Sequence, residues 1–188
     1  MAEHGLEWTW AGKNDREGYC PHTGLWMFPY RGSGGLAPLP PKVGCSMSHF
    51  LLWKRCVELN EPILILEHDS VFLRALPEID FRGICQINDP NGATPRGSQW
   101  STSIAKRGPG VFPKTWIRTE KERHIPDGLA GNSAYLIKPW AAQEVIDKCY
   151  KIGLWINDAL ICKQLFNYIE EYYPFITRVQ QGRSTTTV

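Results

Sequence analysis

Two neighbouring segments of the chain carry clear periodic patterns. From Gly44 to Leu59 there is no Pro, and side chains recur at helical spacing at Met47, Phe50, Leu51, Lys54 and Val57. This pattern predicts a helix over about 46–59, capped by a Ser hydroxyl and ended by the Asn-Glu-Pro sequence at 60–62. The apolar run Ile-Leu-Ile-Leu at 63–66 then predicts a strand buried on both faces, which is typical of parallel sheets.

Strand and helix patterns continue to alternate after this point. We expect strands at 83–88 and 133–137, and a helix that begins at Pro139 and runs to about 153 with Ala142, Val145, Ile146 and Cys149 on one face. A further helix, capped by Asn157 or Asp158, is expected to reach about residue 171. The alternation predicts an α/β fold, a largely parallel sheet flanked by helices, in a single domain over 1–188. Residues 1–42 mix Pro and Gly and are expected to be irregular, with one short strand around 6–11.

Composition narrows the class of protein. The 188 residues are 43% hydrophobic and 21% charged, as in ordinary soluble domains. The net charge of +2 is too small to predict general binding to nucleic acid or membranes, and no apolar run approaches the roughly 20 residues of a membrane span. Six scattered cysteines without a CxxC pair, and an N-terminus without a signal-peptide pattern, favour reduced thiols in a cytoplasmic protein. The aromatic content of 12% suggests that some rings bind sugars or bases.

The stretch 90–119 contains no acidic residue but several basic ones, with Trp and Phe among them. Because it is also rich in Gly, Pro, Ser and Thr, we expect a long loop here, extending over 90–130. Such a loop is either a binding element or a solvated surface segment. As a binding element it would offer Trp100, Lys106, Arg107 and Trp116 to an acceptor substrate.

Two polar clusters flank the predicted strand 63–66. After it come Glu67, His68 and Asp69, at the edge where open α/β sheets place their ligands. If the strand continues, both carboxylates point to one side, where they suit Mg²⁺ or Mn²⁺; the alternative is a solvated strand end. Before it, the sequence Gly-Cys-Ser-Met-Ser-His at 44–49 opens the predicted helix, where free N–H groups favour phosphate; the alternative is a simple helix cap.

These clusters resemble the motifs of a known family. The sequence Val-Gly-Cys-Ser-Met-Ser-His at 43–49, followed by Ile-Leu-Ile-Leu-Glu-His-Asp at 63–69, is similar to the core of family-25 glycosyltransferases, which include lipopolysaccharide-biosynthesis and collagen-galactosyltransferase-like proteins. Downstream, Gly-Asn-Ser-Ala-Tyr-Leu-Ile at 131–137 resembles the second block of the family, and Trp-Ile-Asn-Asp at 155–158 the third. The three blocks occur in the family's order over about 43–177.

The resemblance implies a GT-A-like, Rossmann-type sandwich that transfers a sugar from a nucleotide sugar, most often a UDP-sugar, to an acceptor hydroxyl with inversion. It also implies a divalent cation, Mn²⁺ or Mg²⁺, held by Glu67 and Asp69. Asp69 and Asp158 are the catalytic candidates, with Asp158 as base; its alternative role is a helix cap. Residues expected to bind the donor are Gly44, Ser46, Ser48, His49, Lys54, Glu67, His68 and Asn132.

The chain departs from the family pattern in two places. His68 stands where the family usually has a second acid, and the first strand and helix of the family have no counterpart, so the chain resembles a small, N-terminally shortened member. Such divergent members occur in phages, where some glycosylate modified DNA bases. The acceptor is therefore a lipopolysaccharide or other glycan, or a modified DNA base. A missing strand would expose a sheet edge, which suggests a homodimer.

Two other functions stay open on the sequence alone. A non-catalytic member of the family would bind a glycan, a nucleotide or a nucleic acid without turnover, and His68 favours this reading. A metal-dependent phosphoesterase would use Glu67 and Asp69, but it normally has more clustered His and Asp ligands.

Overall fold

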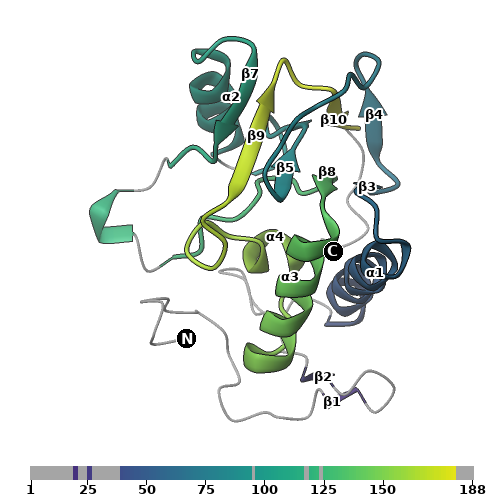
Figure 1. Cartoon of the computed structure of the whole chain (residues 1–188). Helices are drawn as coiled ribbons and strands as arrows, with labels where there is room; N and C mark the ends of the chain where they lie inside the picture. Colours follow the sequence, from purple (N-terminus) through teal and green to yellow (C-terminus); the bar gives the residue numbers. More distant parts are fainter. Residues whose placement is uncertain are drawn as a thin grey trace.

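The computed structural model of the chain describes residues 19–20, 25–26, 39–94, 96–116, 119–122 and 125–180 (Figure 1). The helices are α1 (Leu39–Leu59), α2 (Gly97–Ala105), α3 (Pro139–Ile152) and α4 (Asn157–Leu160), with a 3-10 helix, η2, at Glu120–Glu122. The strands are β1 (Tyr19–Cys20), β2 (Leu25–Trp26), β3 (Ile63–Leu66), β4 (Ser70–Phe72), β5 (Ile84–Gln86), β6 (Asn88–Asp89), β7 (Gly110–Pro113), β8 (Ala134–Ile137), β9 (Ile169–Tyr173) and β10 (Thr177–Val179). The strand expected around 6–11 lies outside the described residues.

A five-stranded sheet in the order β3-β8-β5-β9-β7 forms the centre of the fold. Only β5 and β9 are parallel; β8 runs antiparallel to both β3 and β5, and β7 runs antiparallel to β9. A smaller sheet, β4-β10-β6, contains one antiparallel and one parallel pair. The fold is therefore α/β as predicted, but the prediction of a largely parallel sheet is wrong. Apolar runs of four residues indicate strands but not the direction of their partners.

The strand β3 has the predicted bounds but a different environment. It lies at one end of the strand order, and only Ile65 is fully buried, whereas Leu66 is exposed. The prediction of a strand buried on both faces is therefore wrong. A strand at a sheet edge can carry the same apolar run when a helix covers one of its faces.

The main core lies between the sheet and the pair α1 and α3, which pack side by side (Figure 1). Phe50 and Trp53 of α1 are fully buried, and the predicted apolar face of α3 is confirmed, with Ala142, Val145, Ile146 and Cys149 all buried. The helix α1 ends at Leu59, as predicted, and the following Asn60 adopts a left-handed conformation with φ 53°. No described helix is long and apolar enough to cross a membrane.

Three predicted boundaries are wrong. The helix α1 begins at Leu39 rather than 46, because Pro40 and Pro41 fit into a first helical turn, where no N–H is needed for the helix hydrogen bonds. The helix expected over 157–171 ends at Leu160, and the chain then turns and enters β9. The stretch 90–119 is not one long loop, since it contains α2 and the strand β7, which pairs with β9 at the edge of the main sheet.

Candidate functional site

The Glu67-His68-Asp69 segment forms a turn directly after β3. The Ser70 N–H donates to the Glu67 carbonyl at 3.1 Å, and the Glu67 N–H donates to the Ser133 carbonyl at 2.7 Å. The turn is thus fixed to the residue that precedes β8. The prediction that the two carboxylates alternate along a continuing strand is wrong, because the backbone turns at 67–70. His68 is exposed, Glu67 and Asp69 are half-buried, and Asp69 Oδ1 is buried with no hydrogen-bond partner among the described residues.

Two side chains of α1 lie against Glu67. Cys45 and His49 are four residues apart and therefore share one face of the helix. His49 Nε2 lies 3.0 Å from Glu67 Oε1, and the Cys45 thiol donates to the same oxygen at 3.6 Å. Because 44–49 lies inside α1 rather than at its start, its N–H groups belong to the helix. The prediction of a phosphate seat on free N–H groups there is therefore wrong.

Asn157, the first residue of α4, completes this cluster. Its Oδ1 accepts from the Cys45 thiol at 3.4 Å, and its Nδ2 lies 3.2 Å from His49 Nε2. Cys45, His49, Glu67 and Asn157 are hereafter the Cys45 cluster. It joins three segments that are separated by up to 112 positions in the sequence.

A buried pair of aromatic residues holds the His49 ring. Its Nδ1 lies 2.8 Å from the Tyr135 hydroxyl, and Trp53 Nε1 donates to the same hydroxyl at 2.8 Å. The rings of His49 and Tyr135 are nearly parallel, with an interplanar angle of 8° and centroids 5.7 Å apart. His49 is only 3% exposed, so these contacts fix both its position and its orientation.

Burial and hydrogen bonding set the protonation of the cluster. Burial disfavours the charged form of Glu67, but hydrogen bonds from His49, Cys45 and Asn157 and the charge of His49 outweigh it, so the pKa of Glu67 lies below its ordinary value. Burial, together with the negative charges of Glu67, Asp158 and Asp69, raises the pKa of Cys45 to about 12. The cluster therefore contains an ionised carboxylate beside a protonated thiol.

The other residues predicted to bind the nucleotide sugar or to act in catalysis differ in their burial and contacts. Asp69 lies two residues after Glu67 and Asp158 directly follows Asn157, so both flank the Cys45 cluster, and their negative charges contribute to the raised pKa of Cys45. Asn132 is 3% exposed, and neither polar atom of its amide has a hydrogen-bond partner among the described residues. On α1, Ser46 is buried, whereas Gly44, Ser48 and Lys54 are exposed.

The predicted acceptor residues belong to α2 and the segments around it. Trp100 is a buried residue of α2 whose indole N–H donates to the Thr115 carbonyl, and Lys114 Nζ lies 4.5 Å from the centre of its ring. Lys106 and Arg107 are exposed just after α2, and Trp116 is half-buried. Trp100 thus serves the core rather than an open binding surface.

Sequence reasoning did not select Cys45, Tyr135 or Asn157 as site residues. The four-residue spacing of Cys45 and His49 is a signal that was present, because it places two metal-ligating side chains on one helical face. For Tyr135 and Asn157 no local signal exists, since each reaches the site through tertiary packing.

The Cys45 cluster contains side chains of the types that bind metal ions. Cys45, His49 and Glu67 each offer one ligand atom, and these three atoms lie within 4.8 Å of one another. The described residues thus include a Cys/His/Glu group suited to a metal ion.

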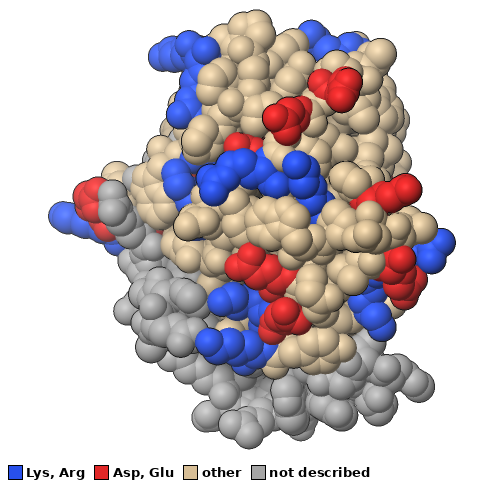
Figure 2. All heavy atoms as spheres, viewed as in Figure 1, with Lys and Arg blue, Asp and Glu red and all other residues tan. Residues whose placement is uncertain are grey.

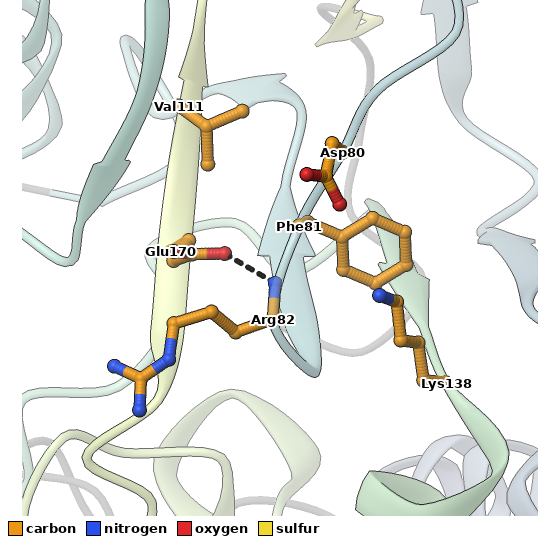
Figure 3. Close-up of a pocket in the computed structure, with 6 residues that line it drawn as sticks. All are labelled: Asp80, Phe81, Arg82, Val111, Lys138 and Glu170. Carbon is orange, nitrogen blue, oxygen red and sulfur yellow. Dashed lines mark hydrogen bonds between the residues drawn. The ribbon is translucent and has the colours of Figure 1, made fainter.

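A separate hollow of about 480 Å³ is lined by Asp80, Phe81, Arg82, Val111, Lys138 and Glu170 (Figure 3). It lies where β5 begins and β8 ends, whereas Glu67 lies beside the start of β8. The Arg82 N–H donates to Glu170 Oε2, and Lys138 Nζ lies over the Phe81 ring at 4.9 Å. With two carboxylates and two cations, this hollow has no single charge preference, and it is distinct from the Cys45 cluster.

Residues 40–80 match the sequence model of a family described as Glycosyltransferase family 25 (LPS biosynthesis protein). The matched segment runs from the first turn of α1 through β3 and β4, and it includes Cys45, His49, Glu67 and Asp69. No curated protein matches the chain significantly. This partial match supports membership of the chain in glycosyltransferase family 25 and confirms the resemblance of the first block, at 43–69.

Proposed function

We propose that the chain is a glycosyltransferase that moves a sugar from a nucleotide sugar, most readily a UDP-sugar, to an acceptor hydroxyl with inversion at the anomeric carbon. The observation that carries the proposal is the convergence of the three family blocks. His49 and Glu67 of the first block, Tyr135 of the second and Asn157 of the third are joined by hydrogen bonds in or beside the Cys45 cluster. The family match to 40–80 supports a nucleotide-sugar donor.

Side chains in and near the Cys45 cluster are suited to bind a divalent cation and the nucleotide sugar. Asp69 Oδ1 is a buried carboxylate oxygen without a partner among the described residues, and the lowered pKa of Glu67 keeps that carboxylate charged. Carboxylate oxygens suit Mg²⁺ or Mn²⁺, which would neutralise the charge of the donor diphosphate. The unpartnered amide of Asn132 is suited to sugar or phosphate oxygens, since it offers both a donor and an acceptor.

Asp158 is the proposed base. In an inverting transfer the acceptor oxygen bonds to the anomeric carbon as the bond to the diphosphate breaks, and a carboxylate takes the proton of the acceptor hydroxyl. Asp158 directly follows Asn157 of the Cys45 cluster, and its negative charge contributes to the raised pKa of Cys45, which supports this assignment. Asp158 would therefore hold the proton while the diphosphate leaves with the electron pair.

The acceptor would bind beside α2, where Lys106 and Arg107 are exposed. Lys, Arg, Asp and Glu are interspersed on the face shown in Figure 2, without a broad patch of one sign. A glycan acceptor suits such a mixed surface, whereas DNA binding normally uses clustered cations. We therefore favour a glycan, such as a lipopolysaccharide, over a modified DNA base.

The first test measures thermal stability with UDP and a panel of sugar nucleotides, with and without Mn²⁺. A donor at a hundredfold excess over its dissociation constant stabilises the folded state by about 2.7 kcal/mol, which shifts the melting temperature by several degrees. We expect a metal-dependent shift with one donor and release of UDP when acceptor is added. No shift with any donor would refute the proposal.

Substitution of Asp158 separates the transferase from a non-catalytic binding protein. In D158N we expect the donor-induced shift to remain and UDP release to fall by about 10²–10⁴-fold. The matched control is D147N, an exposed carboxylate of α3. His68, which is exposed and stands where the family usually has an acid, favours the alternative function, a non-catalytic family member that only binds its ligand. Binding of the nucleotide sugar without turnover in the unmodified protein would support this alternative.

A further inference from the structure

We infer that Cys45, His49 and Glu67 bind a thiophilic divalent cation of the Zn²⁺ class. Three observations carry this inference: the three ligand atoms lie within 4.8 Å of one another, they are of three different chemical types, and two of them share one helical face. Thiolate, imidazole and carboxylate are the side-chain ligands that Zn²⁺ uses in proteins.

The chemistry of these ligand atoms distinguishes this metal site from the site proposed for the cation that binds the nucleotide sugar. A thiolate and an imidazole select zinc, cobalt or similar ions over Mg²⁺, whose ligands are oxygen atoms. Of the two carboxylates proposed for the donor cation, Glu67 belongs to this group and Asp69 does not. The inference does not depend on the proposed function, since it concerns metal binding in the absence of any sugar nucleotide.

Contacts around the ligands fit a metal site. Zinc-binding His residues normally hydrogen-bond through the second ring nitrogen, which fixes the ring. Here Nδ1 of His49 meets the Tyr135 hydroxyl at 2.8 Å, and Nε2 points to Glu67. With a metal on Nε2, Nδ1 would carry the proton and donate it to Tyr135, whose oxygen can accept from both His49 and Trp53.

Three protein ligands leave a fourth tetrahedral position. The candidates for a fourth ligand are Asn157 Oδ1, which lies 3.4 Å from Cys45 Sγ, and water. Cys45 is half-buried and the Glu67 side chain is 29% exposed, so an ion can enter from solvent. Binding would release the thiol proton of Cys45, because the metal coordinates the thiolate.

The test uses the full chain, reduced and stripped of metal, without donor. We expect it to bind one equivalent of Co²⁺, with a thiolate-to-cobalt charge-transfer band and with displacement by Zn²⁺. In C45S the charge-transfer band should vanish, and in E67Q the affinity for Zn²⁺ should fall. Circular dichroism of C45S and E67Q checks that both variants fold.

The matched control is C56S, which alters another thiol of the same helix. Cys56 donates to the carbonyls of Glu61 and Ile137, and a Ser hydroxyl can do the same. This variant should keep the stoichiometry and the charge-transfer band. If the unmodified chain binds no stoichiometric Co²⁺ or Zn²⁺, or if the band survives in C45S, the inference is wrong and the cluster is only a hydrogen-bonded brace.

Discussion

At the scale of single residues, the hydroxyl of Tyr135 fixes the orientation of neighbouring side chains. The Tyr135 hydroxyl is fully buried and meets both His49 Nδ1 and Trp53 Nε1, so one oxygen orients two side chains of α1. Burial raises the pKa of Tyr135 well above its ordinary value, which keeps this hydroxyl protonated. The local sequence predicts Tyr135 only as part of a strand, because hydrogen bonds across 82 and 86 positions leave no local pattern.

Removal of that hydroxyl is expected to destabilise the fold. In Y135F a buried nitrogen of Trp53 loses its acceptor and His49 loses its partner, at a cost of about 1–3 kcal/mol in the free energy of unfolding. Urea unfolding measures this difference. Y173F, which keeps the edge-on contact of Tyr173 with Phe175, is the control and should change stability by less than about 0.5 kcal/mol. Equal effects of the two variants would contradict the role of Tyr135.

The lowered pKa of Glu67 predicts a pH dependence of stability. A carboxyl whose pKa is lower in the folded state stabilises the protein fully above its unfolded pKa of about 4.3, and this contribution is lost as the pH falls through the folded value. E67Q should therefore be less stable than the unmodified chain at neutral pH, and the difference should shrink in acid.

Denaturant unfolding at a series of pH values measures this difference. E58Q, which alters the exposed Glu58–Arg55 pair, should give a small difference at every pH. A difference between E67Q and the unmodified chain that stays constant into acid would show that the Glu67 charge does not contribute.

Close backbone approaches fix how the elements fit together. A Cβ atom on Gly128 would lie 1.6 Å from the Asp158 carbonyl oxygen, so the segment before β8 packs directly on the backbone of α4. Gly44, in contrast, has nothing within 4 Å of a Cβ position and lies inside α1. The sequence predicted the start of α4 but not that it is short, because the bridge between Gly128 and Cys162, just after α4, joins segments far apart in the sequence.

These two glycines predict opposite effects of Ala. G128A should destabilise the protein by about 1–3 kcal/mol, since the methyl group displaces backbone. G44A should stabilise it by about 0.5–1 kcal/mol, since Ala is the better residue in a helix interior. Thermal unfolding of both variants measures these changes, and destabilisation by G44A would argue against the helix at this position.

A buried ion pair joins β9 to the residue after β7. Lys114 and Glu171 are 1% and 2% exposed, with Nζ 3.2 Å from Oε1. K114M should cost about 3–5 kcal/mol, because it leaves the Glu171 carboxylate buried without its cation. The exposed K106M is the control, with an expected change within about 0.5 kcal/mol in unfolding experiments. A cost for K114M as small as that of K106M would contradict the pairing.

For the whole molecule, β3 is an end strand of the five-stranded sheet, and exposed apolar side chains occur in it at Leu66 and in the segment that follows at Phe72, Leu73 and Leu76. Edge strands of this kind can pair with a second chain. The expected homodimer stays a prediction: light scattering should give twice the chain mass at high concentration. A monomer at every concentration would refute it.

Local patterns in the sequence indicated α1, β3, β5, β8 and α3, the apolar face of α3, and the family resemblance of the segment that includes 43–69. These features follow from side-chain periodicity and motifs that lie close together along the chain. Strand direction, the turn at 67–70 and the meeting of Cys45, His49, Glu67 and Asn157 follow only from tertiary packing. Those features depend on contacts between distant segments, and such contacts form only when the whole core packs.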